Sequence, residues 1–172
     1  MIRKTAAAAL LACALPAHAV DGISYETGGG DGMQMWRLGA QWNWEKKWFA
    51  GRRWNIVAFW DFTAGVWDSP ENTVTDLGVT PTFRLQQREF SPIAPYMDAA
   101  IGFHILSKVR VSSRKYLGTN FQFGDHLGVG VRFGQGWRYD IGLRLQHLSN
   151  GGLSKANPGV NFVQLRLAYH FP

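Results

Sequence analysis

Hydrophobic and polar residues alternate with a period of two through almost all of the chain after its first twenty positions. In residues 137–150 (WRYDIGLRLQHLSN) the odd positions are apolar except for the last two, and the even positions are mostly polar, charged or small. This alternation predicts β-strands, because successive strand side chains point to opposite faces. Segments with this pattern cover residues 22–27, 34–44, 54–66, 75–86, 95–106, 121–133, 137–150 and 161–171.

Eight such segments, most of them long enough to cross a membrane at a tilt, predict an all-β fold, an eight-stranded antiparallel transmembrane β-barrel. One set of connections comprises residues 28–32, 68–73, 108–120 and 150–160, and the other comprises 46–53, 87–94 and 134–136. Longer loops of outer-membrane barrels face outside and short turns face the periplasm. The three-residue connection at 134–136 therefore predicts that the second set is periplasmic.

The alternation alone leaves open which face meets lipid, since a soluble lipocalin-like barrel would place its apolar face inside. The charged face also carries many glycines and alanines, as a crowded lumen requires. The apolar face carries aromatic residues near the strand ends, which favours a lipid-facing girdle. These aromatic residues are Trp44, Trp54, Phe133, Trp137, Tyr169 and Phe171.

The chain ends in Tyr169-His170-Phe171-Pro172, which resembles the terminal aromatic signal of outer-membrane barrels apart from the final proline. Because side chains fill an eight-stranded barrel, the charged face predicts an interior network of ion pairs. Its expected members are Arg37, Asp61, Asp76, Arg84, Asp98, Arg132, Arg138, Asp140, Arg144 and Arg166.

The first nineteen residues read as a secretory signal peptide, with a basic start, an apolar stretch at 6–15 and an Ala-His-Ala cleavage pattern at 17–19. A lipoprotein signal at 10–13 (LLAC) and a buried N-terminal helix are the alternatives. The predicted domains are thus a signal peptide, 1–19, and an outer-membrane barrel, 20–172. Cleavage would lower the net charge from +6 to +4 by removing Arg3 and Lys4, an excess too small to suggest a nucleic acid partner.

Composition excludes other classes of protein. An apolar content of 46% argues against disorder, and a single cysteine excludes a disulfide framework. Beyond the N-terminal residues, no run of 18 apolar residues occurs, so a helical membrane span is not expected.

Two polar residues break the pattern of the barrel wall. His147 and Ser149 fall on the odd, lipid-facing side of their strand, whereas His104, His126 and His170 fall on the lumen side. A polar pair against lipid costs desolvation unless it has partners or a function. Serine beside histidine is the nucleophile and base of acyl transfer. The alternative is that the strand has already left the bilayer at residue 147.

Other polar residues follow in the next connection and strand. Asn161 shares the outward face of the last strand, and the hairpin between the two strands lets it approach His147. Asn150 and the amides of Gly151 and Gly152 are candidate donors for an oxyanion.

This region resembles the lipid A 3-O-deacylases, the PagL family, whose motif is His-x-Ser-Asn followed by Asn-x-Gly-x-Glu. The likeness extends in layout over the mature chain, including residues 37–44, and is most specific at 147–161. The resemblance implies that His147 is the base, Ser149 the nucleophile, and Asn150 and Gly152 the oxyanion contacts. Asn157 matches an asparagine of the family near the site.

The chain departs from the motif at Asn161, where the family has glutamate. Asparagine can still orient the imidazole, although it brings no charge to stabilise the imidazolium. Asp125 is a second candidate for that role. It faces outward on its strand, and the short turn at 134–136 predicts that it lies across from about residue 145.

The resemblance implies hydrolysis of the acyl ester at position 3 of lipid A, with no metal, nucleotide or other cofactor. The expected partners are lipopolysaccharide and outer-membrane lipid, and the family also implies a homodimer, which no residue pattern predicts. The predicted outer loops carry cations that can attract lipid phosphates. These are Lys108, Arg110, Arg114, Lys115 and Lys155. A non-enzymatic structural or adhesion barrel and another lipid enzyme, such as a phospholipase or palmitoyltransferase, are the competing functions.

Overall fold

The structure is a computed structural model that describes residues 20–49, 53–87 and 91–172. The predicted signal peptide lies outside the described residues, as do 50–52 and 88–90 within two of the predicted connections. The elements are β1 (Gly22–Gly30), β2 (Met33–Asn43), β3 (Trp54–Asp68), β4 (Thr73–Gln87), β5 (Ile93–Leu106), β6 (Arg110–Ser112), β7 (Lys115–Tyr116), β8 (Phe121–Phe133), the 3-10 turn η1 (Gln135–Trp137), β9 (Tyr139–Ser149) and β10 (Val160–His170).

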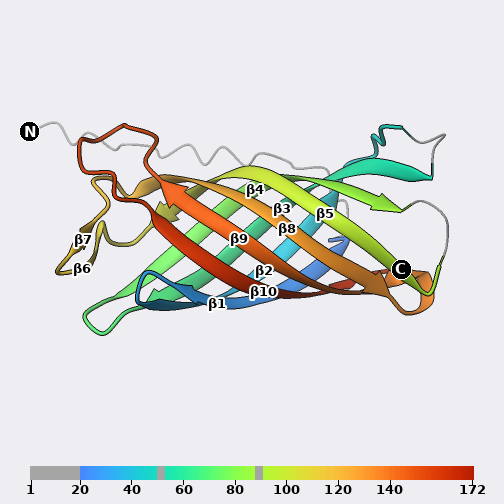
Figure 1. Cartoon of the computed structure of the whole chain (residues 1–172), viewed down its shortest axis with the longest axis horizontal. Helices are drawn as coiled ribbons and strands as arrows, with labels where there is room; N and C mark the ends of the chain where they lie inside the picture. Colours follow the sequence, from blue (N-terminus) through green and yellow to red (C-terminus); the bar gives the residue numbers. More distant parts are fainter. Residues whose placement is uncertain (1–19, 50–52, 88–90) are drawn as a thin grey trace, which may run out of the picture.

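Eight of the strands form the predicted barrel, closed in the order β1-β10-β9-β8-β5-β4-β3-β2 (Figure 1). Every neighbouring pair is antiparallel, and β1 joins β10 to complete the ring. Closure leaves no unpaired strand edge, which is the condition for a sheet to reside in lipid. No helix in the described ranges is long and apolar enough to span a membrane.

The two ends of the barrel differ. One end, here called the loop end, carries the β6–β7 hairpin and the long connection between β9 and β10, and the opposite turn end carries η1 (Figure 1). At the loop end, β1 runs three residues further than the alternation predicted. Its connection to β2 is therefore only Asp31-Gly32, both with positive φ (52° and 77°). Asp-Gly suits such a two-residue hairpin turn because both residues tolerate this backbone region.

The turn end differs from the prediction at Trp137. This residue belongs to η1 rather than to a strand, and its indole nitrogen donates to the Ser91 carbonyl oxygen at 2.6 Å. Gly134 and Gly136 have positive φ, so the chain reverses over more residues than the three that were expected. The following strand, β9, begins only at Tyr139.

Aromatic rings gather on the wall at the turn end. Phe133, Tyr139, Tyr169 and Phe171 form a continuous series, with neighbouring ring centroids 5.6–5.7 Å apart. Trp44 extends past β2 and packs on other rings of the wall. Such a belt places amphipathic rings at the boundary between lipid and water.

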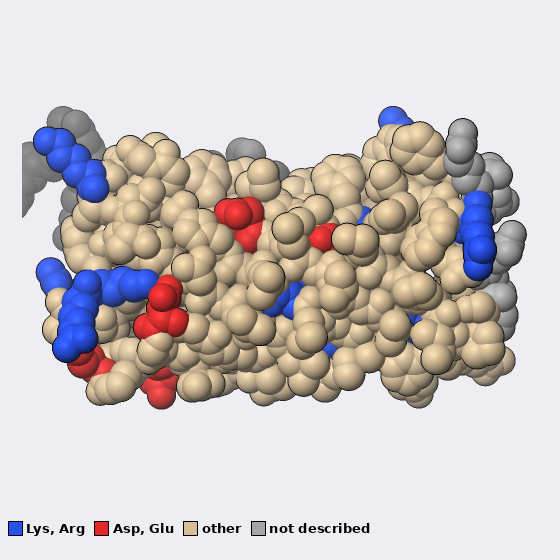
Figure 2. Space-filling view, viewed as in Figure 1, with Lys and Arg blue, Asp and Glu red and all other residues tan. Residues whose placement is uncertain are grey.

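The outer wall is apolar along most of its length. Leucine, isoleucine, valine and phenylalanine side chains point outward on all eight barrel strands and are exposed there. In Figure 2 most of the visible wall is uncharged apart from a few small patches, and the largest groups of charged residues lie at the loop end, with further Lys and Arg at the turn end. This is the surface that a bilayer covers.

The lumen holds most of the predicted network of ion pairs, together with one member that was not predicted. Glu26, which the sequence analysis did not identify, is fully buried and pairs with Arg37, with Arg144 (2.6 Å) and with Arg166 (3.3 Å). Glu26 occupies the inward face of β1. Because Ile23 and Tyr25 point outward, the alternation along this strand could have placed Glu26 in the lumen.

A second centre forms around Asp140. Its carboxylate contacts Arg84 at 2.7 Å and Arg166 at 3.3 Å, and it accepts a hydrogen bond from Tyr96. Two predicted members, Arg132 and Arg138, lie outside this network. Both sit near the turn end, only partly buried, and no ion pair joins either to another described residue.

Apolar side chains close the lumen at the loop end. Trp67, Phe162, Leu148, Val111 and Leu117 are nearly inaccessible and belong to one buried cluster. Val111 belongs to β6, and Leu117 directly follows β7. The β6–β7 hairpin therefore covers the barrel mouth. The cluster gives the loops of this end a fixed base.

Candidate active site

The candidate residues meet on the outer wall near the loop end, in a row that crosses neighbouring strands. His147 of β9 pairs in register with Asp125 of β8 on one side and with Asn161 of β10 on the other. Asp125 therefore lies directly across from His147, two residues further along β9 than the short turn predicted. The longer reversal around η1 accounts for the difference.

A hydrogen bond to Asn161 fixes the orientation of the His147 imidazole. Its Nδ1 lies 2.8 Å from Oδ1 of Asn161. An amide oxygen only accepts, so Nδ1 carries the hydrogen and Nε2 keeps its lone pair. The parity of the two strands predicted this pairing.

Gly159 lies against the same imidazole. Its φ is 64°, and a Cβ atom added there would come within 2.6 Å of Cε1 of His147. Any larger residue would displace the ring or the loop backbone. The β9–β10 connection thus limits where the imidazole can go.

Ser149 follows His147 on the same outward face, at the end of β9, and is partly buried. Residues i and i+2 of a strand are about 7 Å apart at Cα. Its register partner is Phe123, which packs against Phe103 and Phe121. Within the described chain, Ser149 makes no hydrogen bond to His147 or to any other side chain.

Asn150 is fully buried, and its side chain holds the loop together. Nδ2 donates to the carbonyl oxygens of Leu117 (2.9 Å) and Ala156 (2.7 Å), and Oδ1 accepts from the Gly152 amide (2.9 Å). Asn157 accepts from the Asn150 backbone amide at 2.9 Å. The structure thus brings three predicted residues together, Asn150, Gly152 and Asn157. The hydrogen bonds that join them lie within the β9–β10 connection and do not reach His147 or Ser149.

Two charged residues, Asp31 and Lys115, complete the row, and no sequence pattern had indicated either of them as part of the site. The Asp31 carboxylate accepts from the backbone amide of Asn161 (2.8 Å) and pairs with Lys115 (2.8 Å). Burial raises the pKa of Asp31, but hydrogen bonds from Lys115 and the Asn161 amide outweigh it and hold that pKa below its usual range. Asp31 therefore stays charged at neutral pH.

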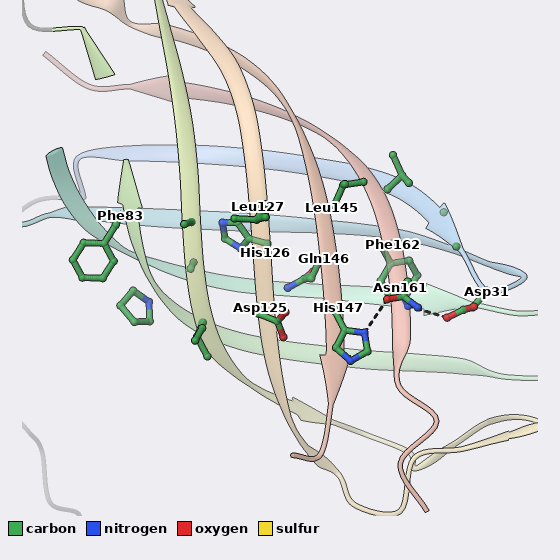
Figure 3. Close-up of a pocket in the computed structure, with 17 residues that line it drawn as sticks. Asp31, Phe83, Asp125, His126, Leu127, Leu145, Gln146, His147, Asn161 and Phe162 are labelled. Atoms are coloured by element: carbon green, nitrogen blue, oxygen red, sulfur yellow. Dashed lines mark hydrogen bonds between the residues drawn. The ribbon is translucent and has the colours of Figure 1, made fainter. Parts of the chain in front are cut away.

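A groove of about 980 Å³ runs along the wall from this row toward β4 (Figure 3). His147, Asn161, Asp31 and Asp125 lie at one side of it. Most of the remaining surface is apolar and is formed by Gly29, Phe83, Ala99, Ile101, Leu127, Leu145 and Val163. Its shape and chemistry suit an alkyl chain that lies beside a polar group.

The remaining histidines are buried in the lumen, as their parity predicted. His104 pairs with Asp76 at 2.8 Å. His126 and His170 are also buried, and His170 lies 3.3 Å from Asp140. Neither His104 nor His170 reaches the outer wall. Residues 20–49, 53–87 and 91–172 contain no cluster of His, Cys, Asp or Glu arranged to hold a metal ion.

Comparison with known proteins identifies the family. The model of the family "Lipid A 3-O-deacylase (PagL)" matches residues 34–170. The chain belongs to the lipid A 3-O-deacylase family. This is the family that the motif at 147–161 resembles, and it makes the protein an ester hydrolase of the outer membrane that acts on lipid A.

Individual relatives agree with this assignment. The lipid A deacylase PagL of Pseudomonas aeruginosa is 29% identical over 138 residues, which cover 79% of this chain and 78% of that protein. The lipid A deacylase PagL of Bordetella bronchiseptica is 41% identical over 76 residues, which are 44% of this chain and 41% of that one. A crystal structure of the outer membrane enzyme PagL superposes with a TM-score of 0.79 at 27% identity, covering 87% of this chain and 99% of that chain.

Proposed function

We propose that this lipid A 3-O-deacylase hydrolyses the ester at position 3 of lipid A with Ser149 as nucleophile, His147 as base and Asn161 as the residue that orients His147. The observation that carries the proposal is the hydrogen bond from Nδ1 of His147 to Oδ1 of Asn161. It leaves Nε2 free to take a proton on the face of the barrel that carries Ser149.

The reaction has two halves. Oγ of Ser149 attacks the ester carbonyl carbon and passes its proton to Nε2 of His147, and the tetrahedral intermediate then expels the sugar oxygen, which takes that proton. A water molecule next gives a proton to Nε2 of His147 as its oxygen attacks the acyl-serine. The fatty acid is released, and Oγ of Ser149 takes the proton back from His147. Asn161 accepts from Nδ1–H throughout.

Asn150 and Gly152, the two residues that the family resemblance implies as oxyanion contacts, take different parts in this proposal. The side-chain amide of Asn150 is engaged by two carbonyl oxygens, so its contribution is to shape the turn. Gly152 can donate its amide if it leaves Oδ1 of Asn150. Gly151, whose amide makes no hydrogen bond within the described chain, is a third donor in the same turn. Asn157 supports them by accepting from the Asn150 backbone.

The groove is proposed to hold the acyl chain during hydrolysis. Its apolar surface begins at the His147 row and continues along the wall, where the hydrocarbon of the outer leaflet would lie. The reacting ester then sits at the boundary between headgroups and chains. All proposed residues belong to one chain, and the homodimer implied by the family resemblance stays a prediction.

The first test replaces the nucleophile. Ser149→Ala should abolish release of the 3-linked acyl chain, because no other group would attack the ester, while the barrel still folds since the side chain is small and lies at a strand end. Mass spectrometry of lipid A from cells that express the variant measures the reaction, and heat-modifiable gel migration reports folding.

Ser154→Ala is the matched control, a serine of the same connection whose hydroxyl makes no hydrogen bond within the described residues. It should deacylate like the unmodified protein. A folded Ser149→Ala variant that still releases the acyl chain would show that Ser149 is not the nucleophile.

A further inference from the structure

The β6–β7 hairpin is held firmly over the barrel mouth. Ser69 donates from Oγ to the Val111 carbonyl oxygen at 2.8 Å. Glu71 accepts from both the backbone amide and the hydroxyl of Ser113. With Val111 and Leu117 fully buried, these bonds fix the hairpin from the side of the β3–β4 connection.

Lys115, the first residue of β7, reaches from this hairpin to the opposite side of the mouth. Its Nζ lies 2.8 Å from Oδ2 of Asp31 and donates to the Gly159 carbonyl oxygen at 2.9 Å. The side chain of Lys115 is 19% exposed, and that of Asp31 is 31% exposed. A partly buried ion pair with a second hydrogen bond restrains its partners more than a solvated surface pair does.

The two partners of Lys115, Asp31 and Gly159, each lie in a segment that contacts the His147–Asn161 pair. Asp31 accepts from the amide of Asn161, whose side chain bonds Nδ1 of the imidazole. Gly159 lies against Cε1 of the same ring. One ammonium group thus connects the two segments that determine the position of the candidate base.

We propose that Lys115 is a positioning residue of the deacylation: by bridging Asp31 and Gly159 it fixes Asn161 and, through Asn161, the imidazole of His147. The inference rests on the proposed roles of His147 and Asn161. A misplacement of a reacting group by about 1 Å can lower a rate by about 100-fold. Lys115 touches no reacting atom, so its contribution is indirect.

A different role would leave a different kinetic signature. If Lys115 served as a contact for a lipid A phosphate, its loss would weaken substrate binding and raise KM. If it positions His147, its loss lowers kcat and leaves KM within about threefold. The two roles are therefore separated by measuring kcat and KM on purified lipid A in detergent.

The experiment compares four single variants and one double variant with the unmodified enzyme. Lys115→Met keeps the length of the side chain without the charge and should lower kcat by about 10- to 100-fold. Lys115→Arg should restore most of kcat, because a guanidinium can contact both oxygens. Arg114 is a neighbouring exposed cation of the same hairpin. Arg114→Met therefore measures how the loss of one hairpin charge by itself changes kcat.

Asp31→Asn is the fourth variant and breaks the ion pair from the other side. Asparagine tolerates the positive φ of this position and can still accept from the Asn161 amide, so the turn should survive. The double variant Lys115→Met/Asp31→Asn should be no slower than Lys115→Met alone, since both changes remove the same interaction. If Lys115→Met fails to fold, Asp31→Asn carries the test.

The outcomes are distinct. Unchanged kcat in folded Lys115→Met and in Asp31→Asn, whatever happens to KM, would overturn the inference. Equal losses of kcat in Arg114→Met and Lys115→Met would also overturn it, because charge alone would then explain the loss. Ser149→Ala assayed in parallel separates the two hypotheses: activity in that variant refutes the proposed function instead.

Discussion

For the individual side chains, the proposed chemistry depends on a neutral amide that orients the imidazole of His147 between two carboxylates. Asn161 holds the imidazole by an amide oxygen, and Asp125 and Asp31 lie on either side of the His147–Asn161 pair. A neutral amide can select the tautomer, but it stabilises the imidazolium less than a carboxylate would. The hydrogen bond favours Asn161 as the residue that orients the imidazole, because the side-chain carboxylate of Asp125 makes no hydrogen bond or ion pair with His147 or with any other described residue.

Substitution of Asn161 tests this assignment. Asn161→Ala should lower kcat by about 10- to 100-fold, because the imidazole loses the acceptor that orients it. Asn161→Glu should keep or raise the rate, since a carboxylate would also stabilise the imidazolium. The measurement is the rate of acyl release from lipid A by the purified variants.

Asp125→Asn is the comparison variant in the same register row and should change the rate less than Asn161→Ala does. The reverse order, with Asp125→Asn strongly impaired and Asn161→Ala nearly silent, would assign the orienting role to Asp125. Full activity in both would mean that His147 works without either residue.

At the element scale, strands β4, β5, β8, β9 and β10 contribute outward side chains to the groove. Ala99 of β5 lies between Phe83 of β4 and Leu127 of β8 in register. Its small side chain keeps this part of the wall recessed. Leu127 and Leu145 are 67% and 63% exposed, as acyl contacts on the wall need to be.

Filling the groove should alter substrate preference. Ala99→Phe is expected to lower kcat/KM for a long-chain acyl ester by about tenfold, equivalent to about 1.4 kcal/mol, because the ring would occupy the path of the chain. A short-chain ester, which needs only the region beside His147, should react nearly as before. Hydrolysis rates of esters of increasing chain length measure this effect.

Ala64→Phe is the matched control, since Ala64 is exposed on β3 and does not line the groove. It should leave the chain-length profile unchanged. Equal effects of Ala99→Phe on short and long esters would contradict an acyl-binding groove.

At the scale of the whole molecule, buried charges hold the barrel interior. Glu26 faces three arginines that come from β2, β9 and β10, so one carboxylate ties distant parts of the ring together. Removing one member of a buried ion-pair network leaves uncompensated charge in a medium of low dielectric constant.

Glu26→Gln should therefore destabilise the barrel by about 3 kcal/mol, although its shape is nearly unchanged. Unfolding in urea, followed by gel migration and tryptophan fluorescence, measures the midpoint. Glu45→Gln, an exposed carboxylate beyond the end of β2, is the control and should stay within about 0.5 kcal/mol. A midpoint for Glu26→Gln that equals that of the control would show that the network contributes little to stability.

The eight strands, their two faces and the outward place of His147, Ser149 and Asn161 could all be predicted from the amino-acid pattern. Parity along a strand is a local property, so a polar residue in an apolar series is visible without the fold. The motif at 147–161 also indicated the family. Strand ends were less certain, as at Trp137 and Gly30, because turns depend on backbone conformations that alternation does not encode.

The residues that meet across the barrel could be identified only from the folded chain. Asp31 and Lys115 reach the His147 row because β1 closes the ring against β10 and because the β6–β7 hairpin packs over the mouth. Asp31 and Asn161 are 130 positions apart in the chain. Glu26 likewise gains its three arginines only on closure. Such contacts depend on register between strands far apart in the sequence, and no local pattern specifies that register.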